Sequence, residues 1–195
     1  MVFSSSKHLY GKLRDMETET KVYLSLLQDE HIDHYMALSD DPELIATMGW
    51  RSFGPGEKER FTQFSRVLSL PNLEGGKAIV FSIISNVDDK AIGYVSIKGI
   101  CETEGRAEVG IAIMEREYRG QGFGTEALRQ AVDYAFNKLG LKLLGLTVFP
   151  SNQRAIRVYE KTGFRKTHVL KNSWLLPSGE YTDMWLMELS RDWLP

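Results

Sequence analysis

The order of apolar and polar residues along the chain follows two different periods, and each period predicts one kind of element. Short runs rich in β-branched and aromatic residues predict strands, whereas apolar residues spaced three and four apart predict helices with one buried face. The expected strands are 21–27, 78–85, 91–100, 107–114, 143–149, 169–176 and 181–189. The expected helices are 29–38, 41–48, 57–69, 125–139 and 152–161.

The order of these elements predicts one domain of the α+β class. Turn residues connect the strands between 78 and 114 in series, which is typical of an antiparallel meander. The period then changes to that of a helix, which Gly140 ends in the expected C-cap position. No internal repeat and no linker-like break interrupts the chain, so we expect a domain at 20–190 that follows a polar N-terminal arm at 1–19.

Composition narrows the class of protein. The chain has 195 residues, a formal net charge of -2 and one cysteine. This balance lacks the basic stripe of a general nucleic-acid binder, so we expect no nucleic-acid partner. No apolar run approaches the roughly 20 residues of a membrane helix, and a single cysteine excludes an intrachain disulfide. Composition therefore predicts a cytoplasmic protein without membrane association.

The stretch RGQGFGTEA at 119–127 places three glycines between a predicted strand and a predicted helix. Bare backbone N–H groups at the start of a helix form a site for phosphate. A nucleotide P-loop is excluded because no lysine follows Gly124. A dinucleotide loop is excluded because the third glycine comes one residue early and the next strand ends without an acid. A phosphate site and a plain tight turn remain as alternatives from this stretch alone.

A second stretch, NQRAIRVYEKTGF at 152–164, decides between these alternatives. The glycine loop fits the pattern [Q/R]-x-x-G-x-[G/A], and the second stretch fits N-x-x-A-x-x-x-Y-x-x-x-G-F. The matching positions are Arg119, Gly122 and Gly124 in the first stretch and Asn152, Ala155, Tyr159, Gly163 and Phe164 in the second. Together the two stretches resemble the signatures of the GNAT superfamily, the acyl-coenzyme A dependent N-acyltransferases. The resemblance covers about 21–189.

The resemblance implies a mixed, largely antiparallel central sheet flanked by helices, with acetyl-CoA as the acyl donor. Two neighbouring strands are expected to splay, so that the pantetheine arm inserts between them and bonds the exposed edge of 112–114. Residues 121–125 are expected to hold the pyrophosphate. Independently, the seven-residue spacing of Asn152 and Tyr159 places both on nearly one helix face. The residues expected to bind the coenzyme are Ala112, Ile113, Met114, Arg119, Gly120, Gln121, Gly122, Phe123, Gly124, Thr125, Asn152 and Tyr159.

Transfer of an acyl group to an amine needs a base for the amine and an acid for the leaving thiolate. The family match gives the acid role to Tyr159, and the alternative is a packed tyrosine bonded to the backbone. Glu108 stands where some histone-type members of the family carry a catalytic glutamate, and the alternative is a solvated glutamate paired with Arg106. Thr147 stands where many ribosomal-type members carry a glutamate instead.

Other reactive side chains predict no further chemistry. Cys101 is a lone thiol on a predicted strand, which is typical of a small apolar residue. His31 and His34 are three apart on a predicted helix and lack a third ligand, so we expect no metal. The basic residues of the helix at 152–161 form a solvated face, unless one of them reaches a coenzyme phosphate.

The predicted function is direct transfer of an acetyl group from acetyl-CoA to a primary amine in a ternary complex. The alternative is a non-catalytic acyl-CoA-binding regulatory module, against which the intact Tyr159 argues. The acceptor, a protein N-terminus or a small-molecule amine, is expected to bind at 21–70 and at the C-terminal hairpin, under a loop that contains Trp50 and Phe53. A homodimer is compatible with the sequence.

The C-terminal stretch WLLPSGEYTDMWLMEL at 174–189 carries a further, weaker resemblance. Through Trp174, Gly179 and Asp183 it is similar to the branch that contains ribosomal-protein N-terminal acetyltransferases.

Overall fold

The computed structural model describes residues 20–49 and 77–194. The predicted arm at 1–19, the predicted helix at 57–69 and the predicted loop with Trp50 and Phe53 lie outside the described residues.

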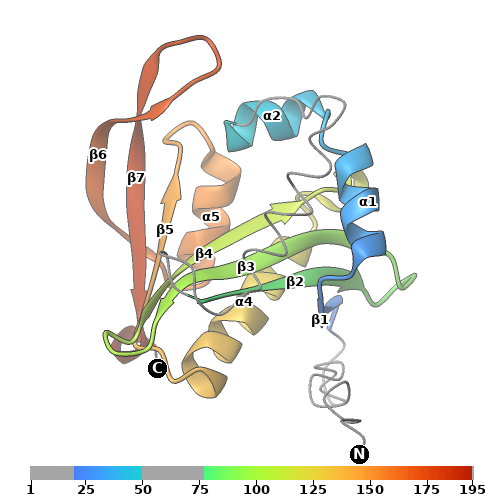
Figure 1. Ribbon diagram of the computed structural model, residues 1–195, viewed down its shortest axis with the longest axis horizontal. Helices are drawn as coiled ribbons and strands as arrows, with labels where there is room; N and C mark the ends of the chain where they lie inside the picture. The colour runs from blue at the N-terminus through green and yellow to red at the C-terminus, as the bar shows by residue number, and fades with distance from the viewer. Residues whose placement is uncertain (1–19, 50–76, 195) are drawn as a thin grey trace, which may run out of the picture.

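The centre of the protein is a seven-stranded sheet in the order β1-β2-β3-β4-β5-β7-β6 (Figure 1). All neighbours pair antiparallel except β4 and β5, which are parallel. The predicted α+β class and the mixed, largely antiparallel sheet are therefore confirmed. The strands are β1 Val22–Leu26, β2 Lys77–Ser85, β3 Ala91–Cys101, β4 Arg106–Ile113, β5 Leu143–Val148, β6 Arg165–Leu175 and β7 Tyr181–Ser190.

Helices cover both faces of the sheet. The helices α4 (Phe123–Asp133) and α5 (Gln153–Lys161) pack on one face, where residues such as Leu128 and Ile156 join the main core. The helices α1 (Asp29–Ala37) and α2 (Pro42–Met48) pack on the other face, where they form a smaller cluster with the end of β4. Side chains of β4 serve both clusters because they alternate between the two faces.

The sheet forks between β4 and β5. The two strands pair at Arg106, Ala107 and Glu108 of β4, whereas β3 follows β4 as far as Ile113. Beyond Glu108 the β5 side of β4 is therefore unpaired, and β5 continues alongside β7 instead. This is the splay that the family resemblance implied, and it opens a space at the centre of the sheet.

The helix expected at 125–139 differs at both ends. It begins at Phe123, inside the glycine stretch, and after Asp133 it widens into a π-helical turn over Tyr134–Lys138. Three consecutive residues of this turn, Tyr134, Ala135 and Phe136, are buried. The single apolar stripe expected from the sequence holds residues three and four apart, whereas at the π-helical turn three neighbours in a row are buried. Gly140, with φ of +69°, ends the element as predicted.

The C-terminal hairpin, β6 and β7, rises beside the fork and meets α2 (Figure 1). A bulge in β6 between Leu170 and Trp174 is held by Asp183, which accepts the N–H of Asn172 at 3.0 Å. The Trp174 ring packs edge-on against Phe149, with ring centroids 6.0 Å apart. Both rings lie against Gly49, the left-handed residue that ends α2.

Candidate active site

A cavity of about 300 Å³ lies at the fork. Its walls come from four places in the chain: residues 111–113 of β4, the glycine loop with the start of α4, one face of α5, and residues 44–48 of α2. Elements that are far apart in sequence therefore meet around one space, which has the size of a small-molecule site.

The glycine loop forms one end of the cavity. Gly120 and Gly122 have φ of +79° and +92°, which only glycine adopts readily. The first N–H groups of any helix lack an intrahelical partner, and Gly122, the N-cap of α4, has no side chain that could accept from them. Gly124, in the first turn of α4, lies beside β4, because an added Cβ would be 3.5 Å from the Ile113 side chain, an ordinary van der Waals contact. This arrangement suits an anion.

Basic side chains surround this end of the cavity. Arg154, Arg157 and Lys161 of α5 line it directly. Lys21, at the start of β1, donates to the backbone oxygen of Gln121 at 2.9 Å and lies over the Phe123 ring. The charge of the site thus matches the phosphates of a coenzyme.

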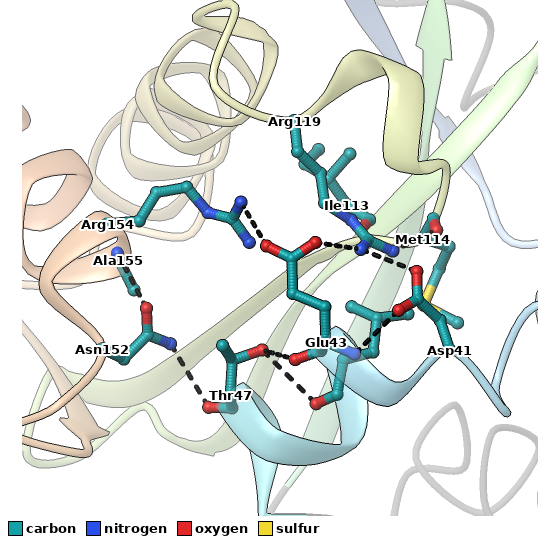
Figure 2. Close-up of polar contacts among 10 residues, drawn as sticks. Asp41, Glu43, Thr47, Ile113, Met114, Arg119, Asn152, Arg154 and Ala155 are labelled. Atoms are coloured by element: carbon teal, nitrogen blue, oxygen red, sulfur yellow. Dashed lines mark hydrogen bonds and ion pairs between the residues drawn. The ribbon is translucent and has the colours of Figure 1, made fainter.

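The side chain of Arg119 is buried and bonds other groups of the protein. It is 4% exposed and donates to the backbone oxygens of Ile113 and Met114, at 2.9 and 2.6 Å. Its Nη1 also bonds Asp41 at 2.8 Å and Glu43 at 3.0 Å (Figure 2). An extended ligand along this edge of β4 would share the Ile113 carbonyl with Arg119.

The two acids that bond Arg119 remain ionised because neighbouring groups donate hydrogen bonds to them. Burial disfavours the charged form of Asp41, but hydrogen bonds from the N–H of Glu43 and from Arg119 outweigh it and lower the pKa of Asp41. Burial also disfavours the charged form of Glu43, but hydrogen bonds from Arg119 and Arg154 outweigh this effect and lower the pKa of Glu43. Arginine on the loop and acids on α2 therefore form a charged cluster at neutral pH.

Asn152 also connects elements. Its Oδ1 accepts the N–H of Ala155 at 3.1 Å and so caps α5, while its Nδ2 donates to the backbone oxygen of Thr47 at 3.2 Å (Figure 2). Asn152 lines the cavity, but its side chain already joins α5 to α2.

Tyr159 lines the cavity from α5 and is 7% exposed. Burial raises the pKa of Tyr159 to about 12. Within the described part of the chain no group hydrogen-bonds its hydroxyl, so the alternative of a tyrosine bonded to the backbone has no support among these residues. A protonated, unpaired hydroxyl in a cleft is able to donate to a ligand.

Glu108 lies at the point where the fork begins, opposite Gly145 of β5. It is about half exposed and pairs with Lys98 at 2.9 Å, whereas Arg106 pairs with Glu104. Glu108 does not line the cavity, and its strand face is that of Ala112, opposite the face that α5 covers. The structure therefore places Glu108 and Tyr159 on opposite faces of the sheet, on either side of the fork.

Most of the residues predicted to bind a coenzyme meet around the cavity, and three do not. Those that line it are Ala112, Ile113, Arg119, Gly120, Gly122, Gly124, Thr125, Asn152 and Tyr159. Met114 and Phe123 are buried in the two core clusters, and the side chain of Gln121 donates to the backbone oxygen of Glu117. For Phe123 and Gln121 the backbone N–H groups are the parts that can reach a ligand.

Sequence reasoning missed several residues of the site. Val158 lies three residues after Ala155, so the helical period was a signal that would have found it. No local signal marks Thr47 and Met48 of α2, which line the cavity, or Lys21, which precedes β1 and contacts the glycine loop. These residues reach the site only through the fold.

Two further properties of the described residues bear on the class of protein. In 20–49 and 77–194, no group of three or more His, Cys, Asp and Glu side chains is arranged to hold a metal ion. None of the helices in these ranges has the length and apolar character that crossing a membrane requires.

Similarity to known proteins defines the class. Residues 21–165 match the family model of the acetyltransferase (GNAT) domain. The chain belongs to this family. Together with the fork and its cavity, this makes the protein an N-acetyltransferase that takes its acetyl group from acetyl-CoA.

Several relatives carry names of the same kind. The chain is 29% identical over 170 residues to the uncharacterized N-acetyltransferase p20 of Bacillus licheniformis, covering 87% of this chain and 92% of that protein. It is 34% identical over 122 residues to the probable N-acetyltransferase YjcK of Bacillus subtilis, covering 60% of this chain and 62% of that protein.

A solved structure shares the fold. Spermidine N-acetyltransferase from Vibrio cholerae, in complex with CoA and spermine, superposes with a TM-score of 0.74 at 20% identity. The superposition covers 89% of this chain and 97% of that chain.

Proposed function

We propose that the protein transfers the acetyl group directly to a primary amine of a small cationic molecule of the polyamine kind, with Tyr159 as the acid. The observation that carries the acid role is the Tyr159 hydroxyl, which is protonated, unpaired among the described residues and open to the cavity. In this proposal the glycine loop and the basic residues of α5 hold the coenzyme phosphates.

Proton transfers divide between the two faces of the fork. Acetyl-CoA supplies the acetyl group as a thioester. Glu108, directly or through a water molecule, accepts the proton that the amine loses as its new C–N bond forms. Tyr159 donates its proton to the thiolate as the C–S bond breaks, and recovers a proton from solvent. The position of Glu108 at the start of the fork supports this division.

The nature of the acceptor is supported by two observations. The chain is 36% identical over 94 residues to spermidine N(1)-acetyltransferase of Escherichia coli, a match that covers 48% of this chain and 50% of that protein. In the sheet, Glu108 and Glu188 both lie opposite Gly145, so two carboxylates stand on the same strand face at the fork, with Lys98 and Arg165 beside them in the same row. Carboxylates on this side of the fork are able to bind the ammonium groups of a cationic acceptor.

A protein N-terminus is the second candidate acceptor. It is favoured by the C-terminal resemblance and by 27% identity over 107 residues to the putative ribosomal N-acetyltransferase YdaF of Bacillus subtilis. That match covers 54% of this chain and 57% of the relative.

The test is release of free coenzyme A from acetyl-CoA in the presence of single acceptors. The acceptors are spermidine, spermine, an aminoglycoside and a peptide with a free N-terminus. We expect release with the polyamines to exceed release with the peptide by at least about tenfold in kcat/KM, which is ~1.4 kcal/mol of discrimination. Release with the peptide alone would support the second candidate. Binding of coenzyme A without release in any mixture would favour the non-catalytic module. The predicted homodimer and cytoplasmic location stay predictions.

A further inference from the structure

Helix α2 depends on its neighbours for its order. It has seven residues, fewer than an isolated helix needs, although Asp41 caps it, Pro42 opens it and Gly49 ends it. Its described polar contacts run to both sides of the coenzyme cleft: to Arg119 on the loop side, and to Arg154 and Asn152 on the α5 side (Figure 2).

Glu43 joins the two sides by itself. Its Oε2 lies 3.0 Å from Arg119 Nη1, and its Oε1 lies 2.7 Å from Arg154 Nη1. The two guanidinium groups thus approach the same carboxylate from opposite sides of the cleft (Figure 2). Arg119 has Asp41 as a second partner, whereas among the described residues Glu43 is the ion-pair partner of Arg154.

The residues next to Glu43 along α2 face the cavity. Leu44, Thr47 and Met48 line it, so α2 forms a wall of the space that the coenzyme would fill. A ligand in this space contacts α2 and both of the elements to which Glu43 ties it. Binding of a ligand in this space and the order of α2 are therefore coupled, both through direct contacts and through the two elements to which Glu43 ties the helix.

We propose that Glu43 is a positioning residue for acetyl transfer, which holds α2 across the cleft so that the helix and the bound coenzyme order one another. The proposal rests on the function proposed above, because it requires the coenzyme in this cavity. The role belongs to the carboxylate that spans Arg119 and Arg154. It predicts that coenzyme binding and the order of α2 are coupled through Glu43, which a residue that only stabilises the fold would not give.

Hydrogen exchange of the full chain, with and without coenzyme A at saturation, tests this coupling. In the wild type, coenzyme A should slow exchange of the α2 amides, such as those of Ile45 and Gly49, by about tenfold or more, as for a segment whose local opening is suppressed. In Glu43→Gln the slowing at α2 should fall below about twofold, while the slowing at Gly122–Thr125 persists. Arg154→Gln breaks the same bridge from the α5 side, so it should reduce the slowing at α2 as much as Glu43→Gln does. The double variant should show no greater reduction than either single variant.

Glu104→Gln is the matched control. It removes the same charge from an exposed ion pair with Arg106 in the β3–β4 turn. In this variant coenzyme A should slow exchange of the α2 amides as much as in the wild type. Wild-type protection of α2 in Glu43→Gln would overturn the proposal, as would a wild type protected at Gly122–Thr125 and not at α2. Absence of protection at Gly122–Thr125 in the wild type would instead reject coenzyme binding in this cavity, and the role of Glu43 with it.

Discussion

Tyr159 retains its proton because its ring is packed between α5 and the core. The ring lies 6.1 Å from that of Phe164, and burial raises the pKa of the hydroxyl from 10.0 to about 12. A phenol with a raised pKa is protonated throughout the physiological range, so Tyr159 carries the proton that its proposed role as acid requires. The wild-type rate should accordingly hold through pH 10 as far as Tyr159 is concerned.

Replacing Tyr159 with phenylalanine removes this proton and keeps the ring. We expect the rate constant for acetyl transfer to fall on the order of 10²–10⁴-fold, the usual worth of a positioned acid. Coenzyme affinity should change by less than about threefold, since in the proposed site the phosphates bind at the glycine loop and not at Tyr159. Single-turnover kinetics and titration calorimetry measure the two quantities. A variant with the wild-type rate would return Tyr159 to a packing role.

Glu108→Gln separates the base from the acid. If Glu108 takes the amine proton, the variant should be slower at neutral pH by about 10²-fold, and raising the pH should partly restore the rate because more amine is then neutral. Tyr159→Phe should show no such recovery, because its deficit is at the leaving group. A flat ratio of variant to wild-type rates across pH would assign the amine proton to water and leave Glu108 as the partner of Lys98.

Sequence motifs located the residues of the site better than they predicted the bonds that the side chains make. Arg119 and Asn152 were both expected at the coenzyme, and both line the cavity. Their side chains nevertheless bond Asp41 and Thr47, partners that lie 78 and 105 positions away in the chain. A motif records spacing within one segment, so it carries no information about a helix that arrives from elsewhere.

At the scale of elements, α2 and the C-terminal hairpin meet at Gly49. An added Cβ there would lie 2.6 Å from Phe149 and 2.8 Å from Trp174, and the residue has φ of +64°. The two rings already pack on each other, so neither can move without disturbing its neighbour. Gly49 thus sets how closely the hairpin approaches the end of α2.

Gly49→Ala should therefore destabilise the protein more than backbone strain alone predicts. We expect a loss of about 2–4 kcal/mol in the free energy of unfolding, from strain and overpacking together. Gly140→Ala is the control, because Gly140 has φ of +69° and no atom within 4 Å of an added Cβ, and it should cost about 1 kcal/mol. Urea unfolding measures both. Equal losses would show that the rings yield freely to the new methyl group.

The elements themselves were largely predictable, because the period of apolar residues depends on local geometry. All seven strands appear, six of them within one residue of the expected bounds, whereas β6 begins at Arg165, four residues before the expected start at 169. The start of α4 was misplaced by two residues because glycines at the N-cap and in the first turn look like loop. The π-helical turn was missed because apolar residues at helical spacing do not distinguish a π-helical turn from α-helix.

At the scale of the whole molecule, coenzyme A should stabilise the native state. A ligand that binds only the folded protein contributes about 2.7 kcal/mol at a hundredfold excess over Kd, or roughly 5–10 °C in Tm for a domain of this size. Gly124→Val should abolish this shift, because the branched side chain would stand between α4 and Ile113, where the loop opens to the cavity. Differential scanning fluorimetry measures it. An undiminished shift in a variant with wild-type Tm would place the phosphates elsewhere.

The fork also bears on how the chain assembles. β2, β3 and β4 follow one another in the chain, as do β6 and β7, so each part of the sheet can form over short chain separations. The parallel pairing of β4 with β5 must instead close across α4, and it offers the residues 106–108 alone as contact points on β4. Pairing of this kind is slow to nucleate. We expect the seam between β4 and β5 to form late in folding and to open early in unfolding, so the opening proposed to receive the coenzyme is also where the newly made chain stays incomplete longest.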